Sequence, residues 1–75
     1  MKYVNGFTLF DSGGNEVRHM MMLEHLKAWF DSDLKEKGYP YVVKDEVSGY
    51  KLEVTENTSV EDWRSFSYKC DLALD

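Results

Sequence analysis

The clearest hydrophobic pattern in the chain predicts an amphipathic helix from about residue 21 to residue 37. Apolar side chains recur there at spacings of three and four, which places them on one face of a helix. They are Met22, Leu23, Leu26, Trp29, Phe30 and Leu34. Asp31 and Lys35 are four residues apart, in the favourable order for a helical ion pair. Gly38 suits a left-handed helix end, and Pro40 prevents the helix from resuming.

The residues before this helix predict a β-hairpin. Residues 3–10 are rich in aromatic and β-branched side chains, which favours a strand. Residues 11–15 read Asp-Ser-Gly-Gly-Asn, a composition typical of turns. Residues 16–20 then form the returning strand. An alternative is that they begin the helix, with Asn15 as its N-cap.

The second half of the chain predicts two further strands, at residues 41–45 and 50–55, joined by a turn at residues 46–49. In the second strand Tyr50, Leu52 and Val54 alternate with polar residues, which indicates one buried face and one wet face. After a loop at residues 56–59, Thr58 or Ser59 can cap a short helical turn.

The C-terminal tail has a period of two, which predicts a final strand. Its apolar positions are Phe66, Tyr68, Cys70, Leu72 and Leu74. The competing interpretation is a helix that runs from Val60 through Trp63 to Phe66 and Cys70.

Together these elements predict a single α+β domain with a four- or five-stranded antiparallel sheet and one main helix packed on one face. The chain has 75 residues, which is enough for one domain. Hydrophobic residues make up 43% and aromatic residues 15%, a composition that argues against disorder. Several strand orders are compatible with this sequence of elements.

Negative charge is concentrated after Tyr39. The net charge is −5, and residues 39–75 contribute −4 of it through eight acids and four bases. Such a surface repels phosphate, so we expect no direct nucleic-acid binding, and it attracts basic proteins. The alternative is that the charge serves solubility alone.

The sequence also bears on localisation. No apolar run approaches the ~18 residues of a membrane span. Residues 1–10 do not resemble a signal peptide, and Cys70 is the single cysteine. We therefore expect a cytoplasmic protein.

Catalytic and metal chemistry find little support. His19 and His25 are six residues apart, which does not place them on one helical face as a metal-binding pair. Combinations with Glu16, Glu24 or Cys70 do not match recurring zinc spacings. Cys70 shares the phase of its apolar neighbours, which favours a buried and inert thiol. We expect no cofactor, no metal and no enzyme.

The leading hypothesis is a protein-binding module that presents carboxylates to a basic protein. In its sharpest form the carboxylates imitate the phosphates of DNA and inhibit a nucleic-acid-binding protein, as small acidic phage or mobile-element inhibitors do. The expected partner-binding residues are Asp45, Glu46, Glu53, Glu56, Glu61, Asp62 and Trp63. Trp63 enters this set because tryptophan is a favoured anchor in interfaces.

Two alternatives come from other classes. A small assembly protein would form a homodimer through a sheet edge or through the aromatic and methionine surface, since small domains gain stability by pairing. At least one of the three methionines at residues 20–22 should lie off the core, where it could contact a partner. The minor alternative is an enzyme or metal protein that uses His19, His25 or Cys70.

Overall fold

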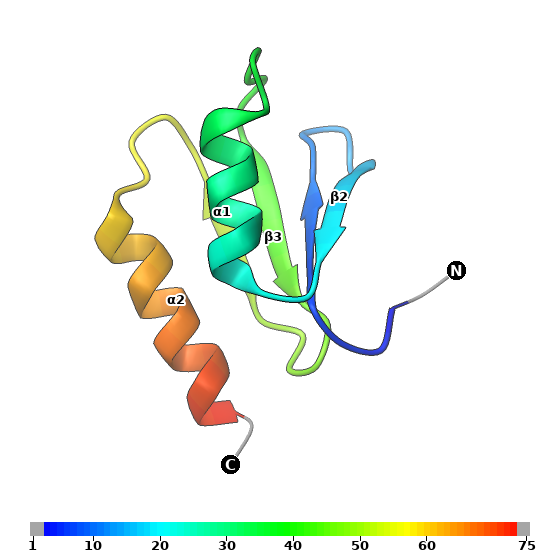
Figure 1. Ribbon diagram of the computed structural model, residues 1–75, viewed down its shortest axis with the longest axis vertical. Coiled ribbons are helices and arrows are strands. Elements are labelled where there is room, and N and C mark those ends of the chain that lie inside the picture. Colours follow the sequence, from blue (N-terminus) through cyan, green and yellow to red (C-terminus); the bar gives the residue numbers. More distant parts are fainter. Residues whose placement is uncertain (1–2, 74–75) are drawn as a thin grey trace.

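The computed structural model describes residues 3–73 and shows a four-stranded antiparallel sheet with both helices on one face (Figure 1). The elements are β1 (Phe7–Phe10), β2 (Glu16–Met20), α1 (Leu23–Ser32), β3 (Tyr41–Asp45), β4 (Lys51–Val54) and α2 (Val60–Ala73). The strand order is β2-β1-β3-β4, and every neighbouring pair is antiparallel. The predicted α+β fold, with an antiparallel sheet covered by a helix on one face, is confirmed.

The predicted hairpin is present as β1 and β2, so Asn15 is a turn residue and not a helix cap. The Asp11 carboxylate organises the turn by accepting the backbone N–H groups of Gly13 and Asn15, each at 2.9 Å. β1 begins at Phe7 and not at Tyr3, because Gly6 takes a positive φ of 84° that turns the chain away from the sheet.

The helix predicted at residues 21–37 is shorter than expected, because α1 ends at Ser32. The longer helix is α2, with 14 residues against 10 in α1. The Ser32 hydroxyl bonds back to the carbonyl of Ala28, which weakens the last turn. Asp31 and Asp33 also lie at the negative end of the helix dipole, where a carboxylate is unfavourable. Asp31 pairs with Lys27 inside the helix and not with Lys35.

The predicted final strand is wrong, and the competing helix is what forms. The Ser59 hydroxyl accepts the N–H of Asp62 at 3.2 Å, and the Asp62 carboxylate accepts the N–H of Ser59 at 2.9 Å. This reciprocal cap starts α2. Trp63, Phe66 and Cys70 are buried at spacings of three and four. This spacing is that of a helix. The apparent period of two came from Tyr68, which is aromatic like the buried residues near it but is exposed in the structure.

The core lies between the sheet and the two helices. Leu9 and Val43 are cross-strand partners and are fully buried in it. Phe30 of α1 joins the layers, because its ring lies 5.3 Å from the ring of Tyr41 and 6.1 Å from that of Trp63. The opposite face of the sheet carries no helix, so the functional surfaces divide into a helical face and an open sheet face.

Candidate functional site

The expected acidic site is not assembled as one surface. The turn that contains Glu46 lies at the lower end of the sheet in Figure 1, whereas the loop that contains Glu56 lies at the upper end. Glu46 and Glu56 are only ten residues apart in the sequence, but in the fold the length of β4 separates them. Each expected residue has to be judged by its own surroundings.

Asp45 is buried and serves the fold. Only 4% of its surface is exposed. Its carboxylate accepts the N–H of Val47 at 3.1 Å and the hydroxyl of Ser48 at 2.8 Å, which fixes the turn between β3 and β4. The Asp45 carboxylate is therefore committed to the turn and does not belong to an exposed acidic surface, which corrects the expectation for this residue.

Glu46 is largely committed within the molecule. One carboxylate oxygen accepts the hydroxyl of the buried Thr8 at 2.6 Å, and the other lies 3.5 Å from the ammonium nitrogen of Lys44. The side chain thereby satisfies a polar group beneath the open face and has its charge balanced. Its contribution to an external negative field is small.

At the start of α2 the expected residues have different fates. Glu61 is exposed and pairs with Arg64 at 2.9 Å, and Asp62 is the helix cap described above. Trp63 is only 6% exposed and packs in the core, so it does not protrude as an interface anchor, which corrects that expectation. Glu53 and Glu56 are exposed, and neither is in an ion pair within residues 3–73.

The residues considered for metal or nucleophilic chemistry lie apart. His19 stacks on Tyr3 and has its Nε2 atom 2.8 Å from the carbonyl oxygen of Asn5, whereas His25 is exposed on α1. Within residues 3–73 no three His, Cys, Asp or Glu side chains are grouped to hold a metal ion.

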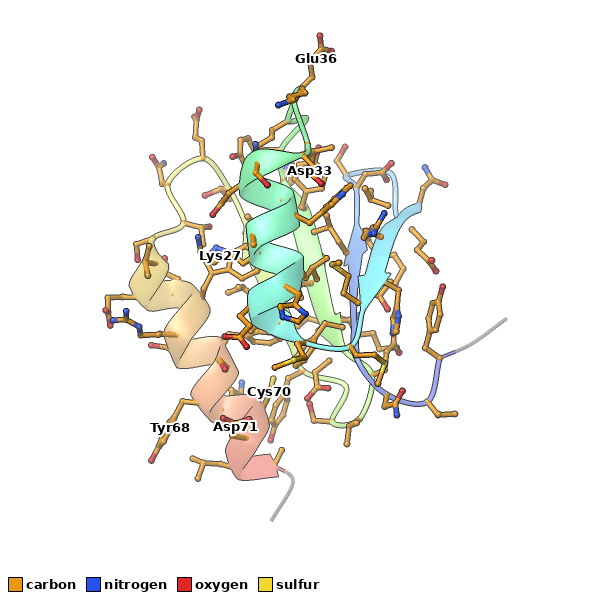
Figure 2. The ribbon with its side chains drawn as sticks, viewed as in Figure 1. Lys27, Asp33, Glu36, Tyr68, Cys70 and Asp71 are labelled. Atoms are coloured by element: carbon orange, nitrogen blue, oxygen red, sulfur yellow. The ribbon has the colours of Figure 1, made fainter. Side chains whose placement is uncertain are left out.

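Cys70 is buried on α2, where its side chain faces the sheet (Figure 2). Burial raises the pKa of its thiol to about 12, and the neighbouring Asp45 carboxylate adds to the effect. A thiol in this state holds its proton at neutral pH and is a poor nucleophile.

A groove runs along the gap between the two helices and continues past the start of α1, between α2 and the turn after β3. Its upper hollow, of about 280 Å³, shares Leu23, Glu24 and Ser67 with a middle hollow of about 350 Å³. The middle hollow shares Met21 and Asp71, among others, with a lower hollow of about 240 Å³. We call the middle and lower hollows the methionine groove. Its outer walls are formed by Met21, Met22, Glu24, Val47, Ser67 and Asp71.

Three apolar side chains of the methionine groove are about half exposed. Met21 is 57% exposed, Met22 is 47% exposed and Val47 is 51% exposed. The prediction that one of the methionines lies off the core is thus confirmed. Methionine is flexible and polarizable, so an exposed pair can adapt to the shape of a bound side chain.

The same groove is acidic. Glu24 and Asp71 are exposed at its rim, and its lining contains no Lys or Arg. Neither carboxylate takes part in an ion pair among the residues that the structure describes. Figure 2 shows Asp71 in the lower half of α2, near the helix end. A carboxylate near the C-terminal end of a helix lies at the negative end of the dipole, which destabilises the helix by about 0.3–1 kcal/mol.

Sequence reasoning missed Glu24 and Asp71 because they come from different helices and from different halves of the charge distribution. The one local signal was the methionine run, which indicated a contact surface without placing it. Only the antiparallel packing of α1 and α2 brings an acid from each helix to the rim of one groove.

No protein-family model, no curated protein and no solved structure matches this chain. In the described part of the chain neither helix is both long enough and apolar enough to cross a membrane. A function must therefore be inferred from the chemistry of the surfaces themselves.

Proposed function

We propose that the protein is a non-enzymatic binding module that receives a basic, apolar segment of another protein in the methionine groove. The observation that carries the proposal is the pairing of two exposed methionines with two carboxylates that take part in no ion pair within residues 3–73. Met21 and Met22 supply adaptable apolar contact, and Glu24 and Asp71 supply negative charge at the rim.

The methionine groove suits an amphipathic helix that has basic residues beside its apolar face. An amphipathic helix places its apolar side chains into a hydrophobic groove and keeps its polar side chains at the rim. Lys or Arg at the borders of that apolar face would meet Glu24 and Asp71. Partial desolvation at the rim strengthens such pairs relative to fully exposed ones.

The net charge of −5 supports a basic partner in general, because it favours association with positively charged surfaces. Nucleic-acid-binding proteins are one class with clustered Lys and Arg, so inhibition of such a protein is the finer form of the proposal. Imitation of a phosphate array would draw on Glu53 and Glu56, the exposed acids of the expected set that take part in neither an ion pair nor a helix cap within residues 3–73. The broader proposal does not depend on it.

The test compares variants that remove equal charge from different places. The groove variant is Glu24→Gln with Asp71→Asn, and the matched control is Glu36→Gln with Asp33→Asn, two exposed acids that follow α1. Each immobilised protein is used to capture binding proteins from a lysate of the source cells. We expect a captured protein to be lost from the groove variant and retained by the control variant.

Salt and a methionine substitution sharpen this test. Capture should weaken steeply between roughly 0.05 and 0.3 M salt, because exposed charges are screened over this range. Met21→Ser should weaken capture at both salt concentrations, because it removes apolar contact and leaves the charge unchanged. Equal losses from the groove and control variants would reduce the interaction to net charge alone and overturn the proposal.

A further inference from the structure

The outer edge of β4 presents backbone hydrogen-bonding groups that the sheet does not use. The N–H of Asp45 donates to the carbonyl of Tyr50 at 2.8 Å, and the register pairs Val43 with Leu52. Because hydrogen-bonded pairs alternate in an antiparallel ladder, Leu52 bonds to β3 and the backbone groups of Lys51 and Glu53 point outward. β4 is the last strand of the sheet on this side.

A hollow of about 310 Å³ lies beside this edge, between β4 and α2. Its lining includes Lys51, Leu52 and Glu53 from the strand and Asp62, Phe66 and Lys69 from the helix. In Figure 1 α2 lies beyond the β4 side of the sheet, so the helix forms one wall and the strand edge the other. We call this hollow the β4 edge groove.

Charge divides the β4 edge groove into two ends. The chain ascends along β4 and descends along α2, so Lys51 and Lys69 share one end whereas Glu53 and Asp62 share the other. The ammonium of Lys69 lies 4.4 Å from the ring centroid of Tyr50, next to Lys51 in the chain, which supports this placement. The groove therefore has a basic end and an acidic end.

We propose that the β4 edge groove binds an extended segment of another protein as a fifth, antiparallel strand. The outward N–H and carbonyl of Lys51 and the N–H of Glu53 would bond to the main chain of the segment, as in other cases of strand addition. The carbonyl of Glu53 already accepts the hydroxyl of Thr58 at 3.4 Å, a long contact that a bound strand would share or replace. Opposite charges facing each other across a strand pair stabilise the register. A basic side chain would therefore lie opposite Glu53 and an acidic one opposite Lys51.

Antiparallel pairing fixes the order of these side chains. The residue opposite Glu53 comes two positions before the residue opposite Lys51, so the segment reads basic, apolar, acidic. The middle residue lies opposite Leu52 and points to the same face, where it would pack against Phe66 of α2. This surface is separate from the methionine groove, and the proposal does not rest on it.

A second copy of the chain also carries a basic, apolar, acidic series in Lys51, Leu52 and Glu53. Its β4, however, has its own α2 packed beside the same edge. Pairing two such edges would bring two helices into one gap. The occupant is therefore a strand without a helix over it, supplied by a different protein.

The probe is a blocked peptide with the sequence Thr-Lys-Val-Glu-Thr, titrated into the isotope-labelled full chain and followed by amide resonances. We expect shifts at Lys51 and Glu53 and at least a tenfold slowing of their hydrogen exchange. The reversed peptide Thr-Glu-Val-Lys-Thr should bind several-fold more weakly. Resonance changes confined to other strands would overturn the proposal.

Exchanging the two charges of β4 tests the proposed register directly. Lys51→Glu with Glu53→Lys should reverse the preference between the two peptides. The matched exchange Lys35→Glu with Glu36→Lys, in an exposed loop, should leave it unchanged. An unaltered preference in the first exchange would overturn the proposal.

Two further measurements separate the alternatives. Sedimentation should show a monomer at the titration concentration; a dimer with Lys51 and Glu53 protected in the absence of peptide would assign the edge to a second copy and overturn the proposal. Glu24→Gln with Asp71→Asn should leave peptide affinity unchanged, which keeps this result distinct from the outcome for the methionine groove.

Discussion

The ring of Tyr3 stacks on the ring of His19, with centroids 3.6 Å apart and planes within 8°. The Tyr3 hydroxyl donates to the carboxylate of Glu16 at 2.8 Å, and the His19 ring bonds to the carbonyl of Asn5. These contacts hold the segment before β1 against β2. They require Gly6 to pass close to the imidazole, because a Cβ at that position would lie 2.7 Å from the Nε2 atom of His19.

Gly6→Ala should therefore destabilise the protein by about 2–3 kcal/mol, since it adds a steric overlap to the cost of a positive φ. Gly14→Ala is the matched control, because Gly14 has a φ of 81° and a Cβ added there would meet no atom within 4 Å. The control should cost about 1 kcal/mol. Urea unfolding of both variants measures the difference, and equal costs would contradict the role of the His19 contact.

Loss of the α2 cap should be measurable in isolation. Ser59→Ala removes the hydroxyl that accepts the Asp62 N–H, and we expect a loss of about 1 kcal/mol in the free energy of unfolding. Ser65→Ala, at an exposed interior position of the same helix, should change stability by no more than ~0.5 kcal/mol. If the two substitutions have the same effect, the hydroxyl is not an effective cap.

The C-terminal helix shows where sequence patterns become ambiguous. Phe66 and Cys70 are four residues apart, a spacing that fits both a strand and a helix. The decisive residues lay upstream, in the Ser59 and Asp62 cap and in Trp63, which extends the helical stripe. The bounds of β2, β3 and β4 were predicted to within one residue, although for β2 a helix start remained the alternative.

The surfaces were less predictable than the fold. The roles of Asp45 and Glu46 depend on hydrogen bonds to Ser48 and Thr8, and the Thr8 contact joins β1 to the turn after β3, far apart in sequence. Charge counting treats all carboxylates alike, whereas the fold uses some to satisfy buried polar groups. Glu24 of α1 became a candidate only when the neighbouring helix was in place.

Cys70 should resist modification in the folded protein. Its thiol is buried and its pKa is raised to about 12 by burial and by Asp45. A thiol-reactive dye at neutral pH should label the native chain at least tenfold more slowly than the chain in urea. Comparable labelling rates in the two states would show that the thiol is accessible.

The same shift in the pKa of Cys70 predicts alkaline destabilisation. The folded state favours the protonated thiol, so the stabilisation is complete below the ordinary thiol pKa and is lost as pH rises from about 9 towards 12. Between pH 7 and pH 10 the wild type should lose more stability than Cys70→Ala, by roughly 1 kcal/mol per pH unit above 9. Parallel curves for the two proteins would contradict the buried thiol as the cause.

Acid should weaken the β1–β2 turn through Asp11. The pKa of its carboxyl is lowered because the carboxylate accepts the backbone N–H of Asn15 and then that of Gly13. This stabilisation is present above the ordinary pKa of 3.8 and is lost as pH falls through the lowered value. Asp11→Asn should be less stable than wild type at pH 7, with the difference shrinking below pH 4; a pH-independent difference would argue against it.

The position of Trp63 allows binding between the helices to be followed by intrinsic fluorescence. This indole lines the upper hollow between the helices, with the Lys27 ammonium 5.8 Å from its ring centroid, so displacement of water or of that cation should alter its fluorescence. The second indole, Trp29, lies under Arg18 and can be silenced by Trp29→Phe. Occupancy of the interhelical gap could then be followed in real time, without a dye or a tag and before the ligand has been identified.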